Sequence, residues 1–178
     1  MRCPNCQTTL IPLDQSSSTV SPYIAHACQE CRCTVVTSST GPAWSFPFLK
    51  VLIVEDNFQN REVLQLMLEN LGCQVSFASD AEQGVGMAFR DRPEVVFMDL
   101  QLVGSHYDGL ECIRILKANE QTKDITVFAY TAEPAPYKVI DAIEAGAVDA
   151  LLKPFKRSQL IDLLVRHFSA PVGAKSSL

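Results

Sequence analysis

Short apolar runs alternate with amphipathic stretches along the chain from Leu49 onward. The runs cover residues 49–54, 74–78, 94–98, 125–130 and 148–152. Runs of this kind, separated by stretches with helical periodicity, predict buried strands joined by helices. Five strands alternating with five helices imply an α/β fold, in which helices cover both faces of a parallel sheet.

Apolar residues between the runs recur at helical spacing. Val63, Leu64, Met67, Leu68 and Leu71 predict one buried face, with Gly72 as a stop signal. The other predicted faces consist of Leu110, Ile113, Ile115 and Leu116, of Val139, Ile140 and Ile143 before Gly146, and of Leu160, Ile161, Leu163, Leu164 and Phe168. Residues 80–92 predict a weaker helix because Gly84 and Gly86 interrupt it.

The chain divides into regions of different character. Residues 1–36 have few large aliphatic side chains, too few for a core of their own, and contain five of the seven cysteines. Residues 37–48 combine turn formers with Trp44, Phe46 and Phe48, which is typical of a linker docked through its aromatic side chains. We therefore predict four segments: a small N-terminal domain over 1–36, a linker over 37–48, the α/β domain over 49–170 and a disordered tail over 171–178.

Composition narrows the class of protein. The 178 residues are 47% hydrophobic and 20% charged with a formal net charge of −5, which is ordinary for a soluble globular protein. Nothing in this balance suggests a broad nucleic-acid surface, and no apolar run is long enough to span a membrane. The start of the chain lacks a hydrophobic signal core, so we expect a cytoplasmic protein. Cysteines in that compartment indicate a metal or free thiols more than disulfides.

Polar side chains follow the predicted strands at their carboxyl ends. They are Glu55 and Asp56 after the first strand, Asp99 after the third, Thr131 after the fourth and Lys153 after the fifth. In parallel sheets functional groups gather at these ends, near the switch in strand order. Neighbouring carboxylates must take up protons or share a cation, and oxygen ligands of this kind suit Mg²⁺. Each residue alone could instead be a helix cap or a solvated strand end.

Residues 49–168 resemble a response-regulator receiver domain of bacterial two-component signalling. The matching segments are VLIVEDN, VVFMDLQL, FAYTAE and GAVDALLKPF, in the order and at the strand ends that the family uses. The resemblance implies a doubly wound (βα)5 flavodoxin-like fold. It covers about two thirds of the chain.

The resemblance also implies a role for each strand-end residue. Asp99 would be the phosphoacceptor, and a histidine kinase or phosphotransfer protein would supply the phosphoryl group. Glu55, Asp56, Asp99 and the backbone carbonyl of Gln101 would hold Mg²⁺. Lys153 would pair with a phosphoryl oxygen, with a cis peptide expected before Pro154, and Thr131 would donate its hydroxyl to the phosphoryl group.

Three features depart from the family pattern. Val103 replaces the usual proline after Asp99, in a loop about two residues longer than usual that contains His106 and Tyr107. Ala150 replaces the aromatic residue that turns inward in many receivers. Pro134 and Pro136 stiffen the start of the fourth helix. These changes bear on the output of the switch more than on its phosphorylation.

The N-terminal cysteines form two C-x₂-C pairs separated by 21 residues: Cys3 with Cys6, and Cys28 with Cys31. This spacing predicts a tetrahedral zinc site, and the stretch resembles a zinc ribbon, a small β domain. Cys33 is the alternative to Cys31 as a ligand, and His26 is a further one. Iron in a rubredoxin-like site and free thiols without metal remain open. With only Arg2 and Arg32 as basic residues, this segment favours a structural or protein-docking role over DNA binding.

The leading hypothesis is a phosphorylation-controlled signalling switch, not an enzyme beyond its own phosphorylation and dephosphorylation. The polar tail after about Ser169 leaves no room for a DNA-binding module, so output would pass to an unknown downstream protein. A homodimer through the fourth helix, fifth strand and fifth helix is one such contact. The alternatives are a scaffold that works without phosphorylation and a DNA-binding regulator that uses the ribbon.

Overall fold

The computed structural model describes residues 9, 11–12, 24–27, 34–38, 41–46, 49–132 and 136–168. Its larger part is a five-stranded parallel sheet with strand order β6-β5-β7-β8-β9. The strands are β5 (Lys50–Val54), β6 (Gln74–Ala78), β7 (Val95–Asp99), β8 (Thr126–Thr131) and β9 (Asp149–Leu152). All five predicted strands are confirmed. The order reverses between β5 and β7, which makes the carboxyl ends of these two strands the switch point of the sheet.

A helix follows each strand of this sheet. They are α1 (Phe58–Glu69), α2 (Ala81–Asp91), α3 (Gly109–Ala118), α4 (Pro136–Ala145) and α5 (Arg157–Phe168). Side chains at the N-caps fix where three of them begin: Asn57 accepts from Asn60 N, Asp80 from Gln83 N, and Asp108 forms a capping box with Glu111.

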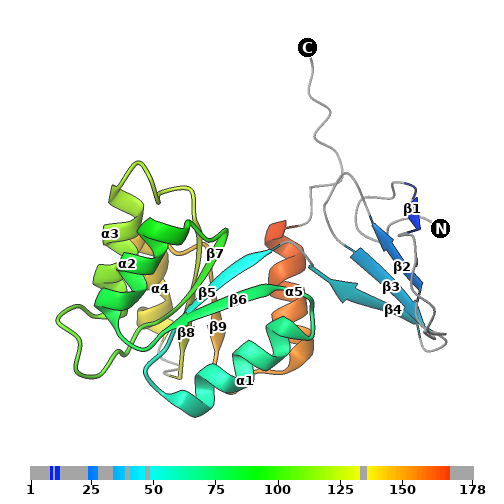
Figure 1. Cartoon of the computed structure of the whole chain (residues 1–178). Helices are drawn as coiled ribbons and strands as arrows, with labels where there is room; N and C mark the ends of the chain where they lie inside the picture. Colours follow the sequence, from blue (N-terminus) through cyan, green and yellow to red (C-terminus); the bar gives the residue numbers. More distant parts are fainter. Residues whose placement is uncertain are drawn as a thin grey trace.

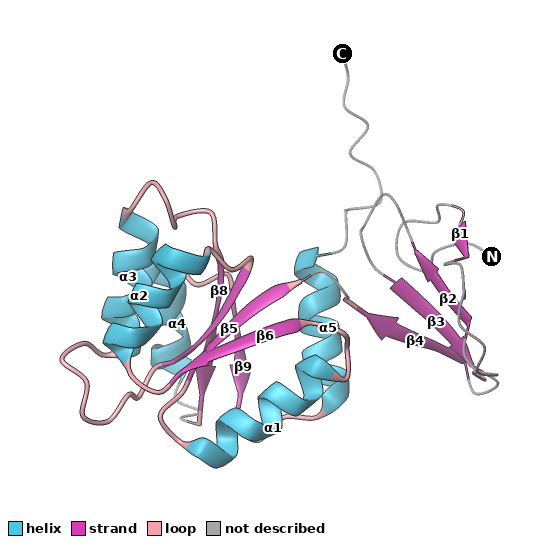
Figure 2. Cartoon of the chain, in the orientation of Figure 1, coloured by secondary structure: helices cyan, strands magenta, loops and turns pink. Residues whose placement is uncertain are grey.

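The helices form a layer on each face of the sheet (Figure 2). One apolar core lies between the sheet and α2, α3 and α4, and includes Val54, Met98 and Ile113. The other lies between the sheet and α1 and α5, and includes Phe97 and Tyr130. Because both faces are covered, the inner strands β5, β7 and β8 are mostly apolar and buried, which explains why they appear in the sequence as continuous runs.

The predicted inward faces of two helices are partly wrong. In α1, Leu64 and Leu68 are buried as expected, but Val63 is exposed. In α4, Ile140 and Ile143 are exposed and the helix instead packs through Ala142 and Ala145. Small alanine side chains bring the helix close to the sheet, which leaves the larger apolar residues outside.

Glycine is needed at two points of the helical layers, at one for close packing and at the other for its backbone conformation. A Cβ on Gly84 would lie 2.7 Å from a methyl group of Val54, so α2 can approach β5 only with glycine there. Gly146 follows α4 with a φ of 113°, in the left-handed region that glycine adopts readily. Gly84 therefore serves packing, although in the sequence it appears only as a weak point of the helix.

A second, antiparallel sheet precedes this domain (Figure 1). Its strands are β1 (Ile11–Pro12), β2 (Ile24–Ala27), β3 (Thr34–Ser38) and β4 (Gly41–Ser45). Residues 37–38 and 41–45 therefore lie in strands rather than in the linker predicted over 37–48. Thr37 pairs with Pro42, and Ser38 with Gly41, in the antiparallel β3–β4 pair.

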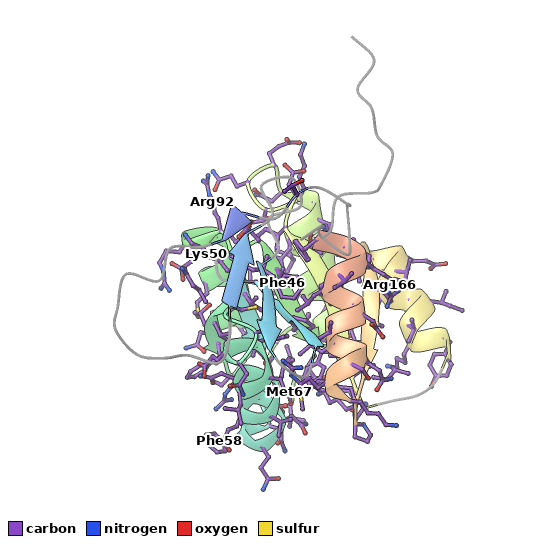
Figure 3. All side chains as sticks on the ribbon, turned by 90° about the vertical axis from the view of Figure 1, so that its right-hand side faces the viewer. Phe46, Lys50, Phe58, Met67, Arg92 and Arg166 are labelled. Carbon is purple, nitrogen blue, oxygen red and sulfur yellow. The ribbon has the colours of Figure 1, made fainter. Side chains whose placement is uncertain are left out.

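Phe46 joins the two parts of the structure. It is buried in the core beneath α1 and α5, and its N–H donates to the Leu71 carbonyl at 2.5 Å. Figure 3 shows Phe46 beside α5. The predicted docking through aromatic side chains is confirmed for Phe46, while the side chains of Trp44 and Phe48 lie outside the described residues.

Among the helices of the described ranges, none combines the length and apolarity needed to cross a bilayer.

Candidate functional site

Three carboxylates meet at the switch point of the sheet. Glu55 directly follows β5, and Asp99 is the last residue of the neighbouring strand β7. Ligand oxygens of Glu55, Asp56 and Asp99 lie within 4.8 Å of one another. Glu55 and Asp99 are buried, and Asp56 is partly exposed. The structure thus brings together the three acidic side chains predicted as metal ligands.

Lys153 supplies the positive charge of the site. It follows β9, and the peptide bond between Lys153 and Pro154 is cis, as expected from the sequence. Its Nζ contacts Oδ2 of Asp99 at 2.7 Å and also donates to Oε2 of Glu55. Because the Lys153 side chain is only 8% exposed, its charge depends on these carboxylates for compensation.

Burial changes the acidity of Glu55. Desolvation raises its pKa above 4.5, and the neighbouring charge of Asp99 raises it further, whereas hydrogen bonds from Lys153 and Asn60 oppose the shift. Its Oε1 accepts from the N–H of Asn57 at 3.2 Å and from the Asn60 side chain at 3.3 Å. These donors from the start of α1 fix the carboxylate in place.

Asp56 faces the loop between β7 and α3 and does not cap α1. The cap is Asn57, whose side chain accepts from Asn60 N. Oδ2 of Asp56 instead accepts from the N–H of Val103 at 3.1 Å. The alternative reading of Asp56 as a helix cap is therefore wrong.

Thr131 ends β8, the strand next to β7, and is fully buried. Asp99 pairs with Tyr130 in the β7–β8 register, which places Thr131 one residue beyond the level of Asp99. The Thr131 carbonyl accepts from the N–H of Lys153 at 2.8 Å. The predicted alcohol and amine are therefore joined through their backbones at the same edge of the sheet.

The loop after Asp99 passes close to the acidic cluster. The N–H of Gln101 donates to Oδ1 of Asp99 at 3.0 Å. At the far end of the loop, a Cβ on Gly109 would lie 2.0 Å from the Asp99 carbonyl oxygen, so only glycine lets α3 begin there. Sequence analysis did not single out Gly109, although a glycine at the start of a helix was the available signal.

His106 belongs to the outer side of this loop. Its side chain is 91% exposed, and both its N–H and Nδ1 contact Oε1 of Glu82 in α2, at 2.8 and 2.9 Å. These contacts lower the pKa of Glu82, the backbone N–H of His106 having the largest effect. A further contact, from Ala81 N to Ser105 Oγ at 3.1 Å, holds the extended loop to α2.

Tyr130 is a second residue of the site that was not identified from the sequence. It is buried in the core, and its ring centroid lies 4.2 Å from Nζ of Lys153. Its hydroxyl donates to the Asn60 carbonyl at 3.3 Å. A tyrosine among the smaller apolar residues of this strand end was the only signal in the sequence.

The proposed zinc ligands Cys3, Cys6, Cys28 and Cys31, and their alternative Cys33, lie outside the described residues. Of His26, the structure describes the backbone, which belongs to β2. Within the described ranges the free cysteines are Cys73 and Cys112, both buried in the α/β domain.

Comparison with known proteins gives a family for this domain. The model of the "Response regulator receiver domain" family matches residues 51–165. The chain is 32% identical over 112 residues to the phosphate regulon transcriptional regulatory protein PhoB of Klebsiella pneumoniae. This match covers 63% of the chain and 48% of the regulator, so the chain spans about half the length of the curated relatives it matches. The DNA-binding response regulator MtrA of Mycobacterium leprae is 29% identical over the same length.

Solved receiver structures have the same fold. One is the receiver domain of a sensor histidine kinase of Pseudomonas aeruginosa, with a magnesium ion coordinated in its active site cleft. It is 35% identical, with a TM-score of 0.61, and the match covers 66% of this chain and 95% of that one. Another is the chemotaxis protein CheY4 of Vibrio cholerae, 27% identical with a TM-score of 0.62, over 67% of this chain and 98% of that one.

Proposed function

Given that the chain belongs to the response regulator receiver domain family, we propose that it is phosphorylated on Asp99 and works as a phosphorylation-dependent switch. The observation that carries the proposal is the cluster itself. Three carboxylates lie within 4.8 Å of one another, and the ammonium of Lys153 is 2.7 Å from Asp99. Helix caps alone would not require these side chains to converge.

In the proposed reaction, a carboxylate oxygen of Asp99 forms a bond to the phosphorus atom of the donor. The bond from phosphorus to the donor's leaving group breaks, and the leaving group keeps the electron pair. The ammonium of Lys153 exchanges a carboxylate oxygen for an oxygen of the transferred group as its partner, and balances the charge of that group. Thr131 donates its hydroxyl to another of these oxygens, so the buried end of β8 responds to phosphorylation.

Glu55, Asp56 and Asp99 fit a magnesium ion, because their oxygens are close together and only one ammonium opposes three negative charges. We propose that these acids, with the Gln101 carbonyl, hold Mg²⁺. When bound, the ion would neutralise the charge that develops on the phosphoryl oxygens. The magnesium ion in the related receiver of Pseudomonas aeruginosa supports this assignment.

Phosphorylation by a small donor tests the proposal. With Mg²⁺ and acetyl phosphate, the wild-type chain should gain one phosphoryl group by intact-mass spectrometry, and Asp99→Asn should gain none. Asp91→Asn is the matched control, because Asp91 is exposed at the end of α2 and pairs with Arg90. Uptake by D99N equal to that of the wild type would place the phosphoacceptor elsewhere. A wild-type chain that takes up no phosphate would favour a scaffold.

We propose a histidine kinase or phosphotransfer protein as the phosphoryl donor, and a protein as the downstream target. The surface of α4 and β9 supports the second assignment, because large apolar side chains are exposed there: Tyr137, Ile140, Ile143, Val148 and Leu152. As one specific contact, we propose a homodimer formed through this surface and α5. Sedimentation with and without phosphodonor, on wild type and Ile140→Asp, measures it.

We place the protein in the cytoplasm, where buried free thiols such as Cys73 and Cys112 stay reduced.

For the N-terminal segment we propose a zinc site formed by Cys3, Cys6, Cys28 and Cys31. The spacing of the two C-x₂-C pairs supports it, because four thiolates spaced in this way are typical of a tetrahedral zinc site. Metal analysis of the full chain should find one zinc per molecule, and Cys28→Ser should lose it. Iron in place of zinc would indicate the rubredoxin-like alternative. A salt-dependent shift of duplex DNA would support the DNA-binding alternative.

A further inference from the structure

The ring of Tyr130 lies against the ammonium of Lys153, with 4.2 Å between Nζ and the ring centroid. Both side chains are shielded from water, since Tyr130 is 1% and the Lys153 side chain 8% exposed. A cation over an aromatic face is attracted by the ring quadrupole, and the attraction is strongest when both partners are desolvated. The contact therefore stabilises the position of the ammonium.

The orientation of this ring is fixed by neighbours on several elements. Its centroid lies 6.5 Å from that of Phe97 on β7 and 5.8 Å from that of Phe155, both in edge-on geometry. Its hydroxyl donates to the Asn60 carbonyl in α1, and the Asn60 side chain in turn donates to Glu55. The ring is thus tied to the same helix turn that holds Glu55.

Resting on the proposed phosphorylation of Asp99, we propose that Tyr130 is a positioning residue that holds the Lys153 ammonium in place for the incoming phosphoryl group. Before transfer, the ammonium is bound by Glu55 and Asp99. After transfer, one oxygen of Asp99 carries the phosphorus, and negative charge lies further out on the phosphoryl oxygens. The ring keeps its electrostatic character through this change, so it can retain the ammonium while the anionic partner is exchanged.

Tyr130 remains uncharged throughout. Burial raises the pKa of its hydroxyl, and the charges of Glu55 and Asp99 raise it further. The phenol therefore acts through its ring face, which the hydrogen bond to Asn60 helps to orient, and takes no part in proton transfer. This distinguishes it from a general acid or base.

Phosphorylation rates of three variants test the inference. With acetyl phosphate and Mg²⁺, Tyr130→Phe, which keeps the ring, should react at close to the wild-type rate. Tyr130→Leu, which removes the ring, should react about ten-fold more slowly. Phe128→Leu is the control for lost packing, because Phe128 is buried on the same strand and the same face of the sheet. It should react at close to the wild-type rate.

A spectroscopic readout reports on the contact itself. In the wild type and Y130F, the Cε protons of Lys153 should show an upfield ring-current shift by NMR, and Y130L should lose it. If Y130L does not fold, Tyr130→Met gives the same comparison, because a flexible methionine fills irregular space without an aromatic face.

Three results would overturn the inference alone: Y130L as fast as the wild type, Y130F as slow as Y130L, or F128L slowed as much as Y130L. If the wild type takes up no phosphoryl group, the proposed function fails and the inference with it. The two failures are distinguishable because the first three results require an active wild-type chain.

Discussion

Nζ of Lys153 lies 2.7 Å from Oδ2 of Asp99, a residue 54 positions earlier in the chain. The same ammonium also contacts Glu55, and Asp56 adds a third carboxylate to the cluster. With every group ionised, three negative charges and one positive charge leave a net charge of −2 at this edge of the sheet. The site is therefore built to attract a cation, and its stability should depend on Lys153.

We expect Lys153→Met to lower the free energy of unfolding by about 3 to 5 kcal/mol at pH 7 without Mg²⁺, because it leaves two buried carboxylates without their partner. Mg²⁺ should restore more stability to this variant than it adds to the wild type, since it replaces the lost charge. Urea unfolding with and without Mg²⁺ measures both effects. Lys156→Met, at an exposed position, should stay within about 0.5 kcal/mol of the wild type. Equal stability of K153M and the wild type would contradict the prediction.

Magnesium affinity should rise with pH above 4.5 because of Glu55. Its pKa is raised in the folded chain, so the folded state binds this proton more tightly than the unfolded state does. The resulting stabilisation is fully present below pH 4.5 and is lost as pH rises through the folded pKa. Mg²⁺ needs the ionised form of Glu55. Between pH 4.5 and the raised pKa of the folded chain, Mg²⁺ binding should therefore release protons, and well above that pKa it should release none.

Calorimetric titration with Mg²⁺ in two buffers of different ionisation enthalpy measures the released protons. Glu55→Gln should show a smaller release within the window. Glu62→Gln, an exposed change on α1, should match the wild type. Proton release by E55Q equal to that of the wild type would assign the titration to another group.

Gly109→Ala should destabilise the domain by about 3 kcal/mol, at the upper end for overpacking. The new Cβ would meet the carbonyl oxygen and carbon of Asp99 and Cα of Leu100, all backbone atoms that cannot rotate away. Gly86→Ala is the matched control, because nothing lies within 4 Å of its Cβ position and alanine favours a helix. It should add about 0.5 to 1 kcal/mol. Denaturant unfolding compares the two, and a neutral G109A would show that α3 can move away from Asp99.

Cys73 and Cys112 should resist thiol reagents in the folded chain. The pKa of each thiol is raised to about 12, and burial is the largest cause in both cases. The change from the ordinary value of 9.0 reduces the reactive thiolate roughly a thousandfold. Alkylation at pH 8, followed by digestion and mass mapping, should label both residues in urea and neither in native buffer. Rapid native labelling of either would mean that its surroundings open readily.

The strands and the clustered polar side chains were predictable for the same physical reason. A strand buried on both faces is apolar along its whole length, so a charged residue at its end is conspicuous. Asp99 after the fully buried run VVFM stands out in this way. Lys153 follows the edge strand β9, which is less buried, and is identified by its place in the GAVDALLKPF segment. Parallel strands then bring such ends together without further information from the sequence.

Helix faces and ring contacts were harder to predict. Ile140 and Ile143 have the spacing of a buried face, yet α4 packs through its alanines and leaves them exposed. Periodicity identifies an apolar side chain but cannot tell a core contact from a docking surface. The contact between Tyr130 and Lys153 could not be predicted for a different reason. Tyr130 lies in β8 and Lys153 follows β9, and these two strands become neighbours only in the folded sheet.

The burial of Phe46 determines where this protein can be cut. A fragment that starts at Leu49 would lose the aromatic side chain that fills the base of the α1 and α5 core, together with a donor to the Leu71 carbonyl. Fusions and truncations that retain Phe46 should yield a more stable receiver domain than those that begin at the first predicted strand. Because β4 ends at Ser45, directly before this anchor, an experimenter separating the two sheets has a single peptide bond at which to divide them.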